Sequence, residues 1–140
     1  MNLVQEAPIL PPAGPQSHPK LRNEMSQSQP VQIRAAELQR KLTQGEPIQL
    51  VDVREDTELD LARLSYPVIH LPLSRLHEWM ETIDSKLNRH HPVAVLCHAG
   101  VRSWHMACWL VEQRGFQQVW NLQGGIDAWS LEADPEIPRY

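Results

Sequence analysis

The sequence predicts an α/β fold: a largely parallel central sheet flanked by helices on both faces. After residue 30, segments with strand character alternate with segments with helical character, an order typical of parallel strands joined by helical crossovers. Residues 48–53 and 92–96 are mostly apolar and rich in valine, as expected for strands buried on both faces. The length of 140 residues fits a single domain.

Hydrophobic spacing and turn residues place the elements in order. In the first helix, Ala35, Leu38 and Leu42 share one face, and Gly45 follows as a stop signal. The expected strands cover residues 31–33, 48–53, 68–71, 92–96 and 119–122, and the expected helices cover 35–42, 55–64, 74–83, 101–113 and a last segment from Gly124-Gly125 through Trp129. Ligands of such sheets bind beyond the carboxyl ends of the strands, so we expect the functional site among the residues after Leu96 and after Val51.

Residues 1–29 differ from the rest of the chain. They are rich in proline, glutamine and serine and show no hydrophobic periodicity, so they cannot bury enough apolar surface to offset the entropy of ordering. We therefore expect a disordered tail over residues 1–29 and a folded domain over residues 30–140.

Charge and composition exclude several classes of partner. The formal net charge is −4 and the pI about 5.9, which gives no electrostatic reason to bind nucleic acid or an anionic membrane. The sequence shows neither a membrane-length apolar stretch nor a basic region typical of a secretory signal. Two cysteines, Cys97 and Cys108, suit a reducing compartment rather than a disulfide scaffold. The expectation is a cytoplasmic monomer.

A candidate catalytic cysteine follows the clearest central strand. The segment after Leu96 reads Cys97-His98-Ala99-Gly100-Val101-Arg102-Ser103 and leads into a helix. Gly100 and Ala99 allow a tight loop with inward backbone N–H groups, and the helix directs its positive end at the same point. Arg102 adds a charge and Ser103 a hydroxyl. Each feature favours a nucleophilic thiolate.

The competing interpretation is a structural cysteine at a strand end, because cysteine is among the most buried residue types. The glycine, arginine and serine that follow Cys97 favour a reactive thiol, since they have no use in an apolar core. Cys108, beside Ala107 and Val111, is expected to be a core thiol. The seven histidines show no paired spacing typical of a metal site, so no metal is expected.

Four segments together resemble rhodanese-like domains. The loop Cys97-x-x-Gly100-x-Arg102-Ser103 resembles their active-site loop, and Leu50-Val51-Asp52-Val53-Arg54-Glu55 their second-strand signature. Gly115-Phe116 and Leu122-x-Gly124-Gly125-Ile126-x-Ala128-Trp129 follow in family order. The last residues, through Pro138-Arg139-Tyr140, resemble rhodanese domains fused to adenylyltransferases. One departure is residues 62–68, which lack the glycine and histidine of many family members.

The resemblance implies a sulfurtransferase without metal or organic cofactor. Cys97 would take a sulfane sulfur from thiosulfate or a persulfide and pass it to a thiol, to cyanide or to a sulfur-acceptor protein. The backbone from His98 to Arg102 would hold the persulfide, with Arg102 binding an anionic donor. Related phosphatases have one more residue in this loop, so the six residues from Cys97 to Arg102 disfavour phosphatase or arsenate reductase activity.

Asp52 and Arg54 match residues that lie near the active-site loop in this family. We expect them to support the loop, with Asp52 pairing with Arg102. Because the loop offers only one fixed charge, thiosulfate is expected to be a modest donor. The alternative function is a non-catalytic interaction or regulatory module, which the presence of Cys97 disfavours.

Overall fold

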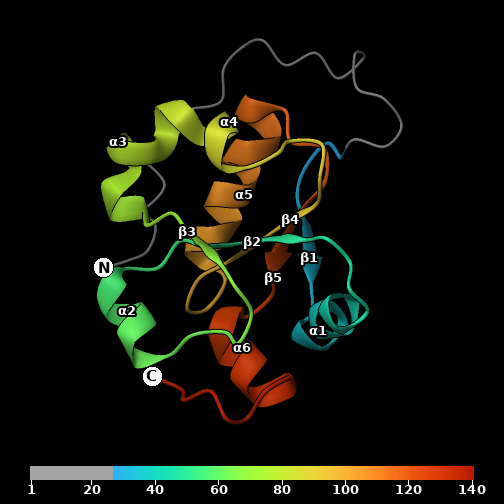
Figure 1. The fold of residues 1–140 in the computed structure, drawn as a ribbon, viewed down its shortest axis with the longest axis vertical. Coiled ribbons are helices and arrows are strands. Elements are labelled where there is room, and N and C mark those ends of the chain that lie inside the picture. The colour runs from blue at the N-terminus through green and yellow to red at the C-terminus, as the bar shows by residue number, and fades with distance from the viewer. Residues whose placement is uncertain (1–26) are drawn as a thin grey trace.

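The computed structural model describes residues 27–140 and contains a five-stranded parallel sheet in the order β1-β5-β4-β2-β3 (Figure 1). The strands are β1 (Val31–Ile33), β2 (Gln49–Asp52), β3 (Ile69–His70), β4 (Val93–Leu96) and β5 (Val119–Leu122). The α-helices are α1 (Ala35–Thr43), α2 (Asp56–Leu61), α3 (Leu76–Trp79), α4 (Ile83–Lys86), α5 (Val101–Arg114) and α6 (Gly125–Glu132). The predicted fold class is confirmed.

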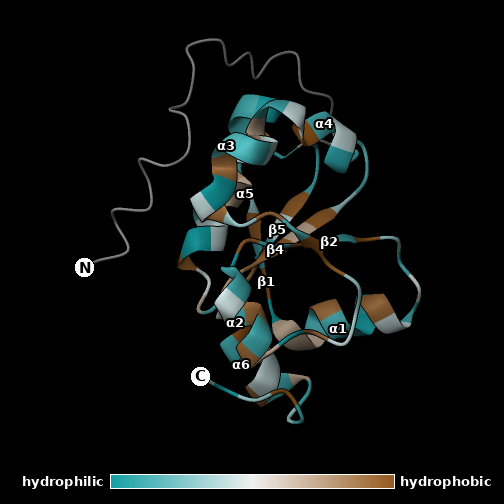
Figure 2. Cartoon of the chain, turned by 60° about the vertical axis from the view of Figure 1, so that its left-hand side comes forward, coloured by the Kyte–Doolittle hydropathy of each residue, from teal (hydrophilic) through white to brown (hydrophobic). Residues whose placement is uncertain are grey.

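Alternation along the central strand β4 divides the apolar residues between two cores. Val93 and Val95 face one side, where α3, α4 and α5 cover the sheet, whereas Ala94 and Leu96 face α1 and α6 (Figures 1 and 2). All four side chains are at most 1% exposed. Figure 2 shows the central strands coloured mainly brown, as expected for strands that are buried on both faces.

The predicted helical stretch over residues 74–83 is present, but it is divided into short α-helices and 3₁₀ turns. A 3₁₀ turn (Leu73–Arg75) precedes α3, and a second one (Met80–Thr82) joins α3 to α4. The buried residues Leu73, Leu76 and Trp79 recur every third position. A three-residue spacing suits the 3₁₀ turns that flank α3, because side chains three positions apart align on a 3₁₀ helix.

Of the tail predicted for residues 1–29, residues 1–26 lie outside the described part of the chain. From Gln27 onward the chain contacts the domain. The Gln27 N–H donates to the Gln117 carbonyl at 3.0 Å, and its side-chain oxygen accepts from the Val119 N–H at 2.9 Å. Contact with β5 therefore begins three residues before the predicted boundary at residue 30.

The sheet brings the residues after β2 and after β4 together. These strands are neighbours, and Asp52 is the register partner of Leu96. The residues that follow each strand consequently leave the same edge of the sheet side by side. Along the part of the chain described here, no helix has the length and apolar character needed to span a membrane.

Candidate active site at the carboxyl end of β4

Cys97 lies directly beyond β4, and its side chain is fully buried. The Gly100 N–H donates to the Cys97 sulfur at 3.0 Å, and the Ser103 hydroxyl donates to it at 3.3 Å. Gly100 has a φ of +102°, a conformation that L side chains rarely adopt, so the loop can curl back toward the sulfur. Both donors direct a partly positive hydrogen toward the sulfur, and this arrangement stabilises a sulfur anion.

Backbone N–H groups at the start of α6 bind carbonyl groups of this loop. The Ile126 N–H donates to the Cys97 carbonyl at 2.9 Å, and the Asp127 N–H donates to the His98 carbonyl at 3.1 Å. A Cβ on Gly125 would lie 2.3 Å from the His98 carbonyl oxygen and 2.6 Å from that of Cys97. The Gly124-Gly125 motif is thus explained by a close approach of two backbones.

Asn121, on β5, completes the support of the loop, and sequence reasoning missed it. Its side chain is 1% exposed, and its amide oxygen lies within hydrogen-bond distance of the Ser103 hydroxyl, whose one proton it shares with the Cys97 sulfur. Its amide nitrogen donates to the Gly100 carbonyl at 3.0 Å. The only sequence signal was a polar residue inside an apolar strand, between Trp120 and Leu122.

Asp52 pairs with Arg54, not with Arg102 as the sequence analysis expected. Arg54 and Asp52 are 0% and 1% exposed, and Arg54 Nη2 lies 2.8 Å from Asp52 Oδ2. Asp52 also accepts from the Arg54 N–H at 3.0 Å. Residues i and i+2 share a face of an extended chain, so Asp52 is satisfied locally and Arg102 takes another partner. Arg54 further donates to the Ala62 carbonyl at 2.8 Å.

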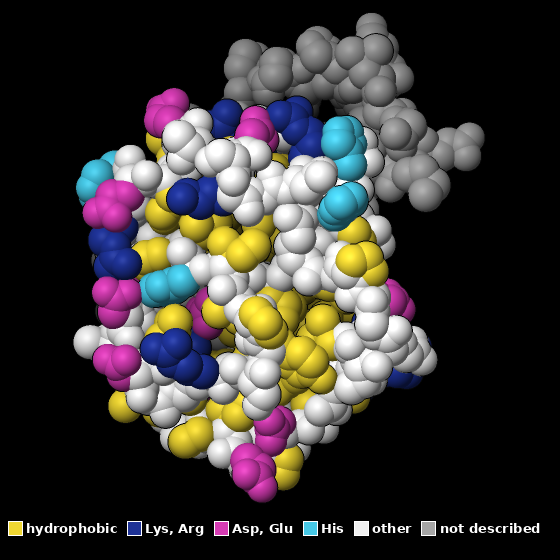
Figure 3. Space-filling view, viewed as in Figure 1, with side chains coloured by type: hydrophobic (Ala, Val, Ile, Leu, Met, Phe, Trp, Pro, Cys, Tyr) yellow, Lys and Arg dark blue, Asp and Glu magenta, His cyan; other side chains and the backbone are white. Residues whose placement is uncertain are grey.

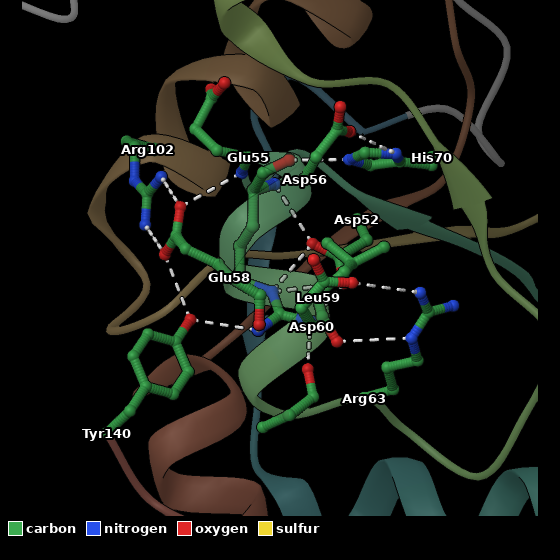
Figure 4. Close-up of polar contacts among 12 residues, drawn as sticks. Asp52, Glu55, Asp56, Glu58, Leu59, Asp60, Arg63, His70, Arg102 and Tyr140 are labelled. Carbon is green, nitrogen blue, oxygen red and sulfur yellow. Dashed lines mark hydrogen bonds and ion pairs between the residues drawn. The ribbon is translucent and has the colours of Figure 1, made fainter.

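That other partner is Glu58 of α2, a residue that sequence reasoning did not identify. The Arg102 guanidinium binds both carboxylate oxygens of Glu58, at 2.8 and 2.9 Å, as Figure 4 shows. Burial would raise the pKa of Glu58, but hydrogen bonds from Arg102 and from the Glu55 N–H outweigh it and hold the pKa at about 2. Glu58 is therefore ionised at neutral pH.

Tyr140 connects the Asp52–Arg54 ion pair with the Glu58–Arg102 ion pair, although it lies far from all four residues in the sequence. Arg54 Nη1 donates to the Tyr140 hydroxyl at 2.9 Å, and that hydroxyl donates to Glu58 at 3.0 Å (Figure 4). Burial raises the pKa of the Tyr140 hydroxyl to about 12, although the bond from Arg54 acts in the opposite direction. Its ring stacks on His98 of the loop, with ring centres 4.0 Å apart.

The remaining predicted residues border the loop or lie apart from it. His98 is half-buried, whereas Ala99 and Val101 are exposed on the outer side of the loop. Cys108 is partly buried on α5, where burial and the Glu112 carboxylate raise the pKa of its thiol to about 11. Within residues 27–140, no group of three or more metal-ligating side chains has a geometry that could hold an ion.

Comparison with known proteins assigns the family. The model of the rhodanese-like domain family matches residues 34–132, which include strands β2 to β5, the Cys97 loop and α6. The chain therefore belongs to the rhodanese-like domain family, and the resemblance noted in the sequence is confirmed.

Named relatives and a solved structure agree with this assignment. The chain is 41% identical over 121 residues to the chloroplastic rhodanese-like/PpiC domain-containing protein 12 of Arabidopsis thaliana, covering 83% of this chain and 40% of that protein. It is 32% identical over 105 residues to the putative sulfurtransferase YtwF of Bacillus subtilis, covering 75% of this chain and 95% of that protein. The crystal structure of a rhodanese-related protein from Thermoplasma volcanium is 30% identical with a TM-score of 0.60, covering 79% of this chain and 99% of that chain.

Proposed function

We propose that this rhodanese-like domain is a sulfurtransferase that carries sulfane sulfur as a persulfide on Cys97. The observation that carries the proposal is the pair of hydrogen bonds from Gly100 and Ser103 to a cysteine sulfur at the carboxyl end of the central strand. Two donors beside the sulfur suit a site that holds an anion in both states, first as the Cys97 thiolate and then as the persulfide anion, whose charge lies on the outer sulfur. The six-residue loop supports sulfur rather than the larger phosphate group as its occupant.

The proposed reaction has two half-steps. In the first, the Cys97 thiolate attacks the outer sulfur of the donor, forming a new S–S bond while the donor's own bond to that sulfur breaks. With thiosulfate, the bonding pair leaves on sulfite and the enzyme keeps a persulfide anion. In the second, an acceptor such as cyanide attacks the terminal sulfur. Thiocyanate departs, and the pair of the S–S bond returns to Cys97 as thiolate.

Each supporting residue has a defined part in this scheme. Gly100 and Ser103 hold the charge on sulfur, and the start of α6 fixes the carbonyls of Cys97 and His98 so that the loop keeps its shape. Asp52 and Arg54 act as a buried support for the neighbouring strand end rather than in a chemical step.

The proposal is tested by measuring thiocyanate formation from a sulfane-sulfur donor and cyanide. Wild type and Cys108→Ser should both turn over, whereas Cys97→Ser should be folded but inactive, because serine lacks the sulfur that carries the cargo. Turnover in Cys97→Ser at the wild-type rate would overturn the proposal. A wild-type protein without turnover toward thiosulfate, organic persulfides or thiosulfonates would favour a non-catalytic module.

A further inference from the structure

The guanidinium of Arg102, the loop's fixed positive charge, is bound along its edge by a carboxylate. We propose that Glu58 is a specificity-determining residue: by pairing with Arg102, it selects against dianionic sulfur donors and favours donors that carry a single negative charge. This inference rests on the proposed function and concerns which donors that same site accepts.

Glu58 is held in place for this role by its own surroundings. It is the third residue of α2, and its carboxylate accepts the Glu55 N–H at 3.0 Å in a capping box. The Tyr140 hydroxyl donates to it at 3.0 Å. The carboxylate is therefore fixed by α2 and by the segment after α6 before Arg102 binds, so little rotational freedom is lost when the ion pair forms.

The ion pair is partly shielded from water. The Arg102 and Glu58 side chains are 15% and 17% exposed. Two parallel N–H···O bonds at 2.8 and 2.9 Å are the preferred geometry between a guanidinium and a carboxylate. An incoming anion would have to compete with a carboxylate that already occupies this geometry.

Two other arginines near the loop also have carboxylate partners. Arg54 is paired with Asp52 inside the protein, and Asp127, whose N–H binds the loop, pairs with Arg139 at 2.8 Å. Along the side of the molecule where α2 and α3 lie, acidic and basic side chains also sit next to one another, as Figure 3 shows. Among residues 27–140, a second negative charge on a donor therefore meets arginines beside the loop that already have carboxylate partners, while it still loses its hydration.

Two donors of the same chemistry separate this effect from reactivity. Thiosulfate carries two negative charges, whereas methanethiosulfonate replaces one oxide by a methyl group and carries one. In both, Cys97 attacks the terminal sulfur, and the leaving group is sulfite or methanesulfinate. The ratio of kcat/KM for the two donors measures the charge preference, and the wild-type ratio should favour methanethiosulfonate.

The decisive variant is Glu58→Gln. Glutamine keeps the side-chain length and an oxygen that caps α2, but it removes the charge that neutralises Arg102. We expect KM for thiosulfate to fall about tenfold relative to KM for methanethiosulfonate, because Arg102 gains an unneutralised charge near the donor. We also expect KM for thiosulfate to depend on salt concentration in this variant and to be nearly independent of salt concentration in wild type.

Two further variants serve as controls. Asp84→Asn removes a carboxylate that pairs with Arg89 at 2.8 Å, in the surface pocket that contains Gln49 at the opposite end of the strands. It changes the net charge equally and should leave the donor ratio unchanged. Tyr140→Phe removes the hydroxyl that braces Glu58 but keeps the ring stacked on His98, and it should shift the ratio in the same direction by a smaller factor.

The outcomes separate this inference from the proposed function. An unchanged donor ratio in Glu58→Gln, or an equal loss of activity toward both donors, would overturn the role of Glu58 while leaving Cys97 chemistry intact. A low-micromolar KM for thiosulfate in wild type would overturn it as well. Failure of both donors to load sulfur on Cys97 would instead reject the sulfurtransferase function. If Glu58→Gln does not fold, the salt dependence of the wild type and the Tyr140→Phe ratio decide.

Discussion

Arg54 and Asp52 form an ion pair inside the protein, with Arg54 Nη2 at 2.8 Å from Asp52 Oδ2 and side chains that are 0% and 1% exposed. Charges removed from water at this depth are tolerated only when each one is fully matched. The guanidinium satisfies this condition by also donating to the Ala62 carbonyl and the Tyr140 hydroxyl. The pair thus connects β2, the segment after α2 and the segment after α6.

Replacing Arg54 by leucine should lower the free energy of unfolding by about 3–5 kcal/mol, because it leaves the Asp52 carboxylate buried without a counter-charge. Chemical denaturation measures the change. The control is Arg89→Leu, which removes an arginine from a pair that is about half exposed, Arg89–Asp84, and should cost less than about 1 kcal/mol. Equal losses in the two variants would show that the Arg54 pair is not specially buried.

Gly125→Ala should disrupt the docking of the Cys97 loop on α6. The added Cβ would lie 2.3 Å from the His98 carbonyl oxygen, so backbone must move. Gly45→Ala is the matched control, because Gly45 has a φ of +82° and no atom within 4 Å of an added Cβ. The control should lose only about 1–2 kcal/mol for its left-handed backbone and keep full activity. Gly125→Ala should lose more stability and most of its sulfur transfer.

The ion pair of Glu58 with Arg102 should make stability depend on pH in acid. The pKa of Glu58 is about 2 in the folded protein against an ordinary value of 4.5, so its contribution is fully present above about pH 5 and disappears as pH falls toward 2. The difference in unfolding free energy between wild type and Glu58→Gln should therefore shrink over this range. Asp60→Asn removes an exposed carboxylate on the same helix, and its unfolding free energy should change with pH in the same way as that of wild type.

Ser103→Ala should slow sulfur transfer by about tenfold or more, because it removes the hydroxyl whose one proton is shared between the charged sulfur and the Asn121 amide oxygen. Ser130→Ala provides the control. Ser130 is also a buried serine, 4% exposed, but its hydroxyl donates to the Ile126 carbonyl within α6. A similar rate loss in both variants would show that the Ser103 effect is a general loss of packing.

The features predicted correctly are those that depend on residues close to one another in the sequence. The strand over 92–96, the loop from Cys97 and the helix after it follow from local hydrophobicity and from glycine at a tight turn. The Gly124-Gly125 motif marked the start of α6. The helical stretch expected over 74–83 is present, but the sequence did not indicate its division into 3₁₀ turns and short α-helices.

The supporting residues of the site could not be found in this way. Glu58 lies 44 positions from Arg102, and Tyr140 lies 82 positions from Glu58. Nothing local distinguishes Glu58 from the other acidic residues of α2, and only the folded sheet brings α2 beside the start of α5. Asn121 was equally hidden, because its partners Gly100 and Ser103 belong to another element.

Mass analysis of the sulfur-loaded protein shows directly which cysteine carries the sulfur. After incubation with thiosulfate or methanethiosulfonate, the peptide that contains Cys97 should gain about 32 Da, the mass of one sulfur atom, and cyanide should remove it as thiocyanate. Cys108, whose pKa of about 11 leaves little thiolate at neutral pH, should remain unmodified. Sulfur found on Cys108, or an adduct that persists in Cys97→Ser, would contradict the assignment of Cys97 as the sulfur carrier.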